Sequence, residues 1–236
     1  MQQGAIPENR RLPVPHWIGI LIIVDCVVVG VYVADHLLGS PIRYIEEFVD
    51  LNREGNLPTW YSSVKWFLAA SLLAVTGYVN RNHRGRSVWV FALLPLLFVL
   101  FSLDEIAEIH EYLGHLSDAL LPGGTRDGTP FSVTGIWMFV VGLPFLILFG
   151  LLVRNLRHWF VGAPSSLIKI IVGVVVSLAG AIGVEGLVTF VINDAYLLAL
   201  QVAVEEALEI AGGTIVVWGC YEYARSCTSF LPRPSA

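Results

Sequence analysis

The sequence predicts an all-α membrane protein: a polytopic helical bundle of six transmembrane helices, with both termini in the cytoplasm and one interfacial amphipathic helix between spans one and two. The composition is 56% hydrophobic and only 14% charged, with a mean hydropathy of +0.70. These values are typical of integral membrane proteins. Several apolar runs reach about 20 residues, enough to cross roughly 30 Å of hydrocarbon as a helix. No linker or low-complexity tract interrupts them, so residues 1–236 are expected to form one integral-membrane domain.

The spans follow from the apolar runs, because a backbone inside lipid has to satisfy its own hydrogen bonds and therefore forms helices. The six predicted spans cover residues 17–38, 60–78, 88–113, 133–153, 167–192 and 196–223. A polar segment containing Arg10 and Arg11 precedes the first run. That run is long, and "VYVADH" is a poor small-residue cleavage site, so an uncleaved span is expected rather than a signal peptide.

The basic side chains set the orientation of the bundle. The side that carries the termini has ten of them: Arg10, Arg11, Arg81, Arg84, Arg86, Arg154, Arg157, Lys169, Arg225 and Arg233. The opposite side has four: Arg43, Arg53, Lys65 and Arg126. By the positive-inside rule both termini are cytoplasmic, and the expected location is the bacterial inner (plasma) membrane. In this arrangement no lysine or arginine lies deep in the predicted spans.

The segment "PIRYIEEFVDLNREGNLPTWYSS" joins the first two predicted spans. Its apolar residues recur at helical spacing opposite Glu46, Glu47 and Asp50, so an amphipathic helix lying flat at the membrane interface is expected. Gly55 should end this helix, and Thr59 should cap the second span.

The stretch "LDEIAEIHEYLGH" closes the third predicted span with a dense group of ionisable side chains. At about 100° per residue, a continuous helix places four of them in one stripe with a fifth beside it, while His110 points away. The stripe consists of Asp104, Glu108, Glu111 and His115, and the neighbour is Glu105.

The sixth predicted span contains Glu205, Glu206 and Glu209, with apolar sequence on both sides. If the membrane began only after Glu206, the remaining run would be too short to span it, so these acids are expected within the membrane region. Each would cost roughly 2.5–3.5 kcal/mol at mid-membrane if it faced lipid. They should therefore face protein, with spans three, five and six packed together.

The fifth predicted span carries one acid, Glu185, at a similar depth. Small residues at Gly173, Ser177 and Gly180 lie on the same span and allow close approach of a neighbouring helix. The acids of spans three, five and six all fall in the outer half of the bundle when counted from the predicted boundaries. This agreement in depth predicts one acidic cluster.

The first predicted span adds polar residues at two depths. Asp25 lies near the middle, where pairing with a neighbouring helix and a functional role are both open, and Asp35 and His36 lie near the outer end. An intramembrane acid without a partner is costly, so such residues are expected to face the bundle interior.

Carboxylates gathered at one depth must share protons, contact water or bind cations. A divalent metal ion is therefore predicted, with iron, zinc or manganese favoured because histidines accompany the carboxylates. The predicted ligands are Asp104, Glu105, Glu108, Glu111, His115, Glu205, Glu206 and Glu209. The predicted supporting residues are Glu185, His110, Asp35 and His36. A metal-free core that shares protons remains the alternative, because Ala107 stands where the Glu-x-x-His pattern of di-iron proteins would need a glutamate.

Three segments together resemble an uncharacterised family of bacterial multi-span membrane proteins with an acidic patch in two helices. They are "NLPTWYSS", "SLDEIAEIHE" and "VEEALEIAGG". The resemblance covers most of the chain and implies the same membrane layout and the importance of the patch. It implies no activity.

Three classes of function fit these features. The first is an integral membrane metalloprotein, including enzymes whose metal activates water or dioxygen. The second is an accessory subunit of a larger membrane complex, and the third is a cation or proton transporter. The lipid bilayer is the expected partner, with other membrane proteins as further candidates, and nucleic acid is excluded by the acidic, apolar composition. Cys26, Cys220 and Cys227 follow no metal-ligand spacing and are expected to be free thiols.

Overall fold

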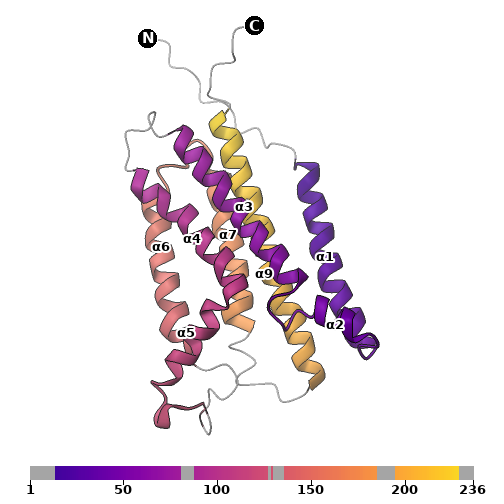
Figure 1. The fold of residues 1–236 in the computed structure, drawn as a ribbon. Helices are drawn as coiled ribbons and strands as arrows, with labels where there is room; N and C mark the ends of the chain where they lie inside the picture. The colour runs from indigo at the N-terminus through magenta and orange to yellow at the C-terminus, as the bar shows by residue number, and fades with distance from the viewer. Residues whose placement is uncertain (1–13, 81–87, 127–128, 130–135, 185–194, 229–236) are drawn as a thin grey trace, which may run out of the picture.

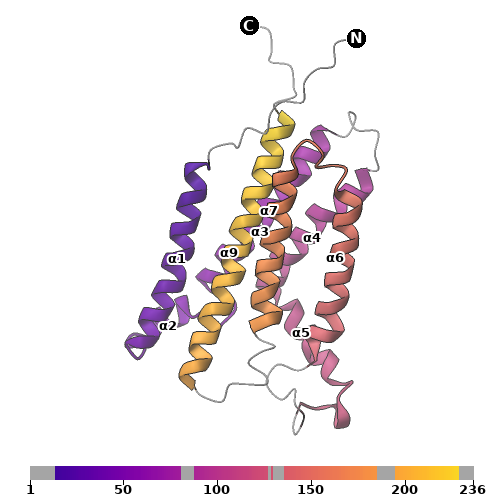
Figure 2. The same ribbon diagram turned by 180° about the vertical axis from the view of Figure 1, so that it is seen from behind.

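The computed structural model describes residues 14–80, 88–126, 129, 136–184 and 195–228, and all regular elements among them are helices. The long helices are α1 (His16–Leu37), α3 (Leu57–Val79), α4 (Val88–Ala107), α6 (Leu143–Leu156), α7 (Pro164–Leu178) and α9 (Ala195–Thr228). They run alternately up and down in one bundle (Figure 1, Figure 2). The start of α1 and the end of α9 therefore lie at the same end of the bundle, at the top in Figure 1.

Shorter elements gather at the other end. They are α2 (Arg43–Val49), α5 (Ile109–Asp118), the 3-10 turn η1 (Pro122–Gly124), and the π-helical segments η2 (Met138–Gly142) and η3 (Ala179–Val184). The segment η2 leads into α6, and η3 continues α7. We call this the α2/α5 end of the bundle.

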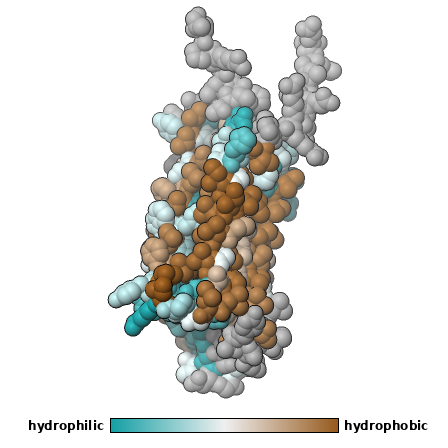
Figure 3. All heavy atoms as spheres, turned by 90° about the vertical axis from the view of Figure 1, so that its right-hand side faces the viewer, coloured by the Kyte–Doolittle hydropathy of each residue, from teal (hydrophilic) through white to brown (hydrophobic). Residues whose placement is uncertain are grey.

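Four of the described helical stretches are long and apolar enough to cross a membrane: His16–Leu37, Leu57–Val79, Met138–Leu156 and Pro164–Val184. They coincide with predicted spans one, two, four and five. Apolar side chains cover much of the face seen in Figure 3, with hydrophilic residues gathered toward the two ends. The exposed residues of α1 include Ile20, Ile23 and Val27, which suits a surface in contact with lipid.

Apolar and aromatic side chains fill the bundle toward the end that carries the start of α1. The rings of Phe91 and Trp159 lie 4.6 Å apart, and those of Phe160 and Tyr223 lie 4.2 Å apart. Phe91, Phe160 and Tyr223 are fully buried. This half of the interior is therefore a packed apolar core.

Glycines allow α7 and α9 to approach closely. A Cβ added to Gly173 would lie 2.7 Å from the carbonyl oxygen of Gly212, and one added to Gly180 would lie 2.6 Å from the carbonyl oxygen of Glu205. Both distances are shorter than a side chain tolerates, so only glycine fits. The expected close contact at Gly173 and Gly180 is confirmed, and it holds the acidic turn of α9 against the fifth predicted span.

The third predicted span is broken, and the expectation of one continuous helix through residue 113 is wrong. The helix α4 ends at Ala107, Glu108 adopts a left-handed conformation with φ 52° and ψ 37°, and α5 begins at Ile109. The side chain of Asp104 accepts a hydrogen bond from the backbone N–H of His110 at 2.8 Å. That carboxylate replaces a helical carbonyl as the acceptor, which allows the chain to turn here.

A helix between the first two predicted spans is confirmed as α2, whose Tyr44 is 83% exposed, and its placement at a membrane interface stays a prediction. The helix ends at Val49, so the expectation that Gly55 ends it is wrong, and Gly55, with φ +75°, lies instead in the turn before α3. The cap of α3 differs from the prediction, because Asn56 rather than Thr59 is the N-cap. The Asn56 side chain accepts a hydrogen bond from the Thr59 backbone N–H at 3.2 Å. Asn56 also donates to backbone carbonyls of the preceding turn, which explains why it holds this position.

Candidate functional site

A cavity of about 820 Å³ opens at the α2/α5 end, and its lining comes from α1 to α7, η2, η3 and α9. Its described lining contains ten carboxylates and a single arginine, Arg126. The carboxylates are Asp35, Glu46, Asp50, Glu54, Asp104, Glu105, Glu111, Glu205, Glu206 and Glu209. Arg126 donates a hydrogen bond to Asp118 at 2.6 Å, so most of its charge is already matched. The cavity is strongly acidic.

The cavity brings together most of the residues singled out in the sequence. Seven of the eight predicted ligands line it: Asp104, Glu105, Glu111, His115, Glu205, Glu206 and Glu209. The supporting residues Asp35, His36 and His110 line it as well. Glu108 does not belong to the described lining, because it sits at the break between α4 and α5. Glu185 lies outside the described residues.

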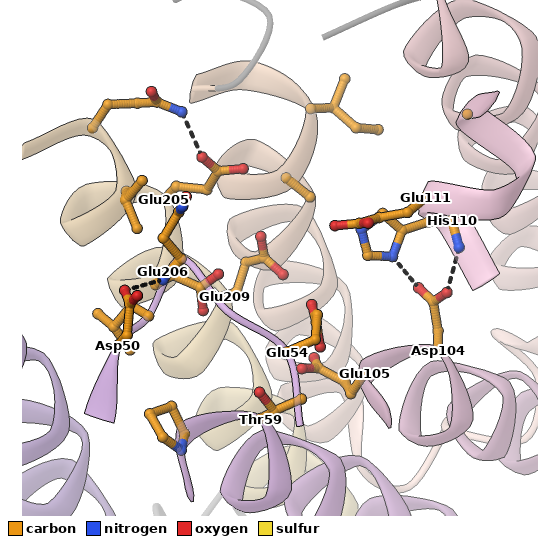
Figure 4. Close-up of a pocket in the computed structure, with 18 of the residues that line it drawn as sticks. Asp50, Glu54, Thr59, Asp104, Glu105, His110, Glu111, Glu205, Glu206 and Glu209 are labelled. Carbon is orange, nitrogen blue, oxygen red and sulfur yellow. Dashed lines mark hydrogen bonds and ion pairs between the residues drawn. The ribbon is translucent and has the colours of Figure 1, made fainter. Parts of the chain in front are cut away.

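Four carboxylates form the deep part of the cavity: Glu54, Glu105, Glu206 and Glu209 (Figure 4). They come from three elements, and the charge of each acts on the others. Glu105 accepts hydrogen bonds from Ser62 at 2.9 Å and from the indole of Trp66 at 3.2 Å. We call these four residues the deep carboxylates.

Glu54 is the deep carboxylate that the sequence did not indicate. It belongs to the segment between α2 and α3, which folds back over the cavity because Gly55 and Asn56 turn the chain. Its Oε2 atom is buried and has no hydrogen-bond partner among the described residues. Burial, and then the negative charges of Glu105, Glu108 and Glu111, raise the pKa of Glu54 to about 7, although the charge of His110 acts in the opposite direction.

Asp104 and His110 form a pair on one side of the cavity (Figure 4). The ring Nδ1 of His110 lies 3.1 Å from Asp104 Oδ2, and the ring centroid lies 5.8 Å from that of Trp137. Burial lowers the pKa of His110, but the hydrogen bond and charge of Asp104 outweigh it and raise the pKa to about 9. The prediction that His110 points away from the acids is wrong, since it assumed an unbroken helix.

A second polar cluster lies deeper in the bundle and centres on Lys65. This lysine is 2% exposed, and its Nζ donates to Asp25 Oδ1 at 3.3 Å and to the carbonyl oxygen of Ile210 at 2.5 Å. Asp25 also accepts hydrogen bonds from Tyr61 at 2.7 Å and from Thr214 at 2.6 Å. The expectation that no lysine lies deep in the spans is therefore wrong. The pairing proposed for Asp25 is confirmed, and Asp25 was itself the sequence signal for a buried cation.

Two π-helical segments form a further wall of the cavity, and η3 packs against the acidic turn of α9, because a Cβ added to Gly180 would lie 3.0 Å from Cγ of Glu209. Val141 and Gly142 of η2, and Ala181 and Ile182 of η3, line the cavity. A Cβ added to Gly142 would lie 2.8 Å from Ile182, so these two segments are in close contact. Such local widening of a helix is frequent at functional sites.

The described residues contain no group of three or more His, Cys, Asp or Glu side chains already arranged to hold a metal ion. The carboxylates face a shared space, and a metal would have to draw them together by changes of side-chain rotamer. What the arrangement offers directly is a concentration of negative charge in a partly enclosed volume. This favours a cationic occupant.

These features define a class: an all-helical protein with membrane-length apolar helices and an acidic cavity at one end of the bundle. Within that class, the chain belongs to the family described as "Domain of unknown function (DUF8692)", whose model matches residues 20–223. The match confirms membership of an uncharacterised family. Neither a curated protein nor a solved structure matches the chain.

Proposed function

We propose that this chain is an integral membrane protein of six spans, with both termini in the cytoplasm, in the inner membrane of a bacterium. The lengths and hydropathy of four helices support this proposal. The helices α4 and α9 run antiparallel to their neighbours in the same bundle, as two further spans would. The basic residues near the termini support the cytoplasmic assignment.

The orientation is tested with single cysteines in a background without Cys26, Cys220 and Cys227. A membrane-impermeant maleimide applied to intact cells should label Asn52→Cys and should miss Arg84→Cys. After the cells are permeabilised, both positions should react. Labelling of Arg84→Cys in intact cells would reverse the orientation.

The cavity is proposed to bind cations, and the excess of carboxylates in its lining is the observation that carries this proposal. Ten carboxylates face the cavity with one arginine, which is already paired. Carboxylates held together out of bulk water repel one another, and a bound cation relieves that repulsion. Cation binding is therefore expected to stabilise the folded protein as well.

A divalent metal ion among the deep carboxylates is the specific form of this proposal. Oxygen ligands suit manganese or iron, and an imidazole from His36 or His115 on the cavity wall tilts the choice toward iron or zinc. Glu111, His115 and Glu205 are on the cavity wall and are the additional ligands available. The Asp104 carboxylate is already hydrogen-bonded to His110, so in this proposal it positions α5 and does not bind the metal. A metal bound here would polarise an oxygen or activate water, which is the route to an enzyme.

The transporter and the accessory subunit have less support. Transport needs a polar path from the cavity to the opposite end. Packed aromatic and aliphatic side chains, among them Phe91, Phe160 and Tyr223, fill much of the described interior there, and the buried carboxylate of Glu222 is paired with Lys169. An accessory role predicts a polar core that serves assembly alone. The cavity, at about 820 Å³, is in the size range of small-molecule sites, a feature that an assembly role does not predict.

Metal content of the protein purified without chelator, together with Mn²⁺ binding followed by electron paramagnetic resonance, tests the proposal. The wild type should carry metal or bind Mn²⁺ at a defined stoichiometry. Glu206→Gln and Glu209→Gln should lose that binding. The matched control is Glu47→Gln, which removes an exposed carboxylate that pairs with Arg43 on α2. Metal-free wild type that binds no Mn²⁺, with both glutamine variants equally stable, would contradict the metal and support a metal-free polar core.

A further inference from the structure

The cavity is larger than a metal ion needs. A divalent ion with six waters, at about 30 Å³ for each water, fills roughly 200 Å³. The cavity measures about 820 Å³, which lies in the range of sites that hold small organic molecules. The remaining volume indicates a second, organic occupant.

The lining of the cavity combines two chemically distinct sets of side chains. The acids come mainly from α9, α4 and the segment before α3. The apolar set comes from α4, the start of η2, α6, α7 and η3: Phe101, Trp137, Val141, Phe145, Leu178 and Ile182. A molecule that matches both sets has a positive group and an apolar part.

If the bundle spans the membrane as proposed, the position of α2 and α5 connects this cavity with the lipid phase. Each helix turns one side toward the cavity, through Glu46 on α2 and Glu111 on α5. Each exposes apolar residues on its other side, including Phe48 on α2 and, on α5, Leu116, which is 71% exposed. Such faces insert into the interface of a bilayer. The cavity therefore opens at the depth where amphipathic molecules reside.

We propose that the cavity binds an amphipathic amine, a molecule with a protonated amino group and an unbranched apolar tail, taken up from the lipid phase. The ammonium group lies among the carboxylates, and the tail lies along the wall formed by Trp137, Phe145 and Ile182. The buried, unpartnered Oε2 of Glu54 accepts a hydrogen bond from such a group. Anionic amphiphiles are excluded by the ten carboxylates. This inference does not require the metal.

The test is equilibrium binding of radiolabelled dodecylamine to the full chain in nanodiscs of zwitterionic lipid, with empty nanodiscs as background and EDTA present. Binding above background should saturate at one molecule per chain. Competing alkylamines should gain roughly threefold to fourfold in affinity for each added methylene. Dodecanol should compete at least tenfold more weakly than dodecylamine, and dodecanoate should not compete.

Two pairs of variants separate the roles of the head and the tail. Phe145→Ala should weaken dodecylamine at least tenfold and leave butylamine unchanged, which also shows that the variant is folded. Leu151→Ala, an exposed leucine on the same helix, is its control. Glu205→Gln should weaken both amines, and Glu47→Gln should weaken neither.

Specific outcomes overturn the inference. The inference fails if dodecylamine shows no saturable binding above that of empty nanodiscs. It also fails if dodecanol or dodecanoate competes as well as dodecylamine. Equal loss of both amines in Phe145→Ala would remove the tail site. Because EDTA is present, amine binding without any Mn²⁺ binding leaves this inference standing while the metal fails. Mn²⁺ binding without amine binding would support the metal site and contradict the amine site.

Discussion

Asp104 contacts His110 at two points, accepting a hydrogen bond from its backbone N–H at 2.8 Å and pairing with its ring Nδ1 at 3.1 Å. This double contact spans the break between α4 and α5, where Glu108 takes a left-handed conformation. A non-glycine residue in that conformation costs about 1–2 kcal/mol and persists only when the surroundings enforce it. Asp104 therefore fixes the direction of α5, and with it the position of Glu111 in the cavity.

The first prediction concerns this break. Asp104→Ala should lower the free energy of unfolding by about 1–3 kcal/mol, because it leaves the His110 N–H without its acceptor. Asp104→Asn keeps an acceptor oxygen and should cost less. Chemical denaturation in detergent measures both, and hydrogen exchange of the α5 amides should speed up in Asp104→Ala alone. Equal protection of α5 in all three proteins would contradict a positioning role for Asp104.

The second prediction concerns the buried pair of Lys65 and Asp25. Lys65→Met should lower the free energy of unfolding by roughly 3–5 kcal/mol, because Asp25 is left as an uncompensated buried charge. The double variant Lys65→Met/Asp25→Asn should recover a large part of that loss. Thermal unfolding of the two single variants and the double variant forms the measurement. Additive losses would show that the two residues act independently.

The third prediction is the pH dependence of stability in metal-free protein. Glu54 has a pKa of about 7 in the fold, above its ordinary value of 4.5, so folding favours its protonated form and its contribution falls as pH rises from 4.5 to 7. His110 has a pKa of about 9, above its ordinary 6.5, so its contribution is complete below 6.5 and is lost as pH rises through 9. Both groups therefore lower the free energy of unfolding as the pH rises. Glu105, Glu108, Glu111 and Asp104 are the other charges that act on them, and the two groups also act on each other, because Glu54 raises the pKa of His110 and His110 lowers that of Glu54.

Unfolding measured between pH 5 and pH 9 should therefore show stability decreasing steadily with pH. Glu54→Gln should flatten the part below pH 7 and move the remaining loss to lower pH, because the charge of Glu54 helps to raise the pKa of His110. His110→Gln should remove the loss above pH 7 and move the Glu54 part to higher pH, because the charge of His110 lowers the pKa of Glu54. Stability that rises between pH 5 and pH 7 in the wild type would contradict the raised pKa of Glu54.

The fourth prediction concerns the contact between α7 and α9. Gly212→Ala places a Cβ 2.6 Å from the carbonyl oxygen of Gly173, so the helices must separate, at a cost of about 1–3 kcal/mol. The matched control is Gly150→Ala on α6, where a Cβ meets no atom within 4 Å. That control should be neutral or slightly stabilising, because alanine favours helix. Similar melting temperatures for both variants would show that the contact adapts.

The helices and the gathering of acids were predictable from local sequence. An apolar run in lipid can satisfy its backbone hydrogen bonds only as a helix. The helices α1, α3, α6 and α7 therefore lie close to their predicted spans. Carboxylates that cannot face lipid must face protein, which is why Glu105, Glu206 and Glu209 meet in one cavity. Glycine spacing likewise predicted the approach of α7 to α9, because only backbone without a side chain packs at that distance.

Features that depend on a particular contact between distant residues came only from the tertiary structure. The break at Glu108 arises because one carboxylate outcompetes a helical carbonyl, a preference that helical periodicity does not contain. In the sequence, Lys65 lies near the start of the second predicted span and was assigned to the side opposite the termini. Its burial depends on Asp25 and Thr214, which contact it from two other helices. Glu54 enters the cavity because a turn folds its segment back over α3. Periodicity describes which face of a helix is apolar, whereas side-chain pairing across helices decides where each charge is compensated.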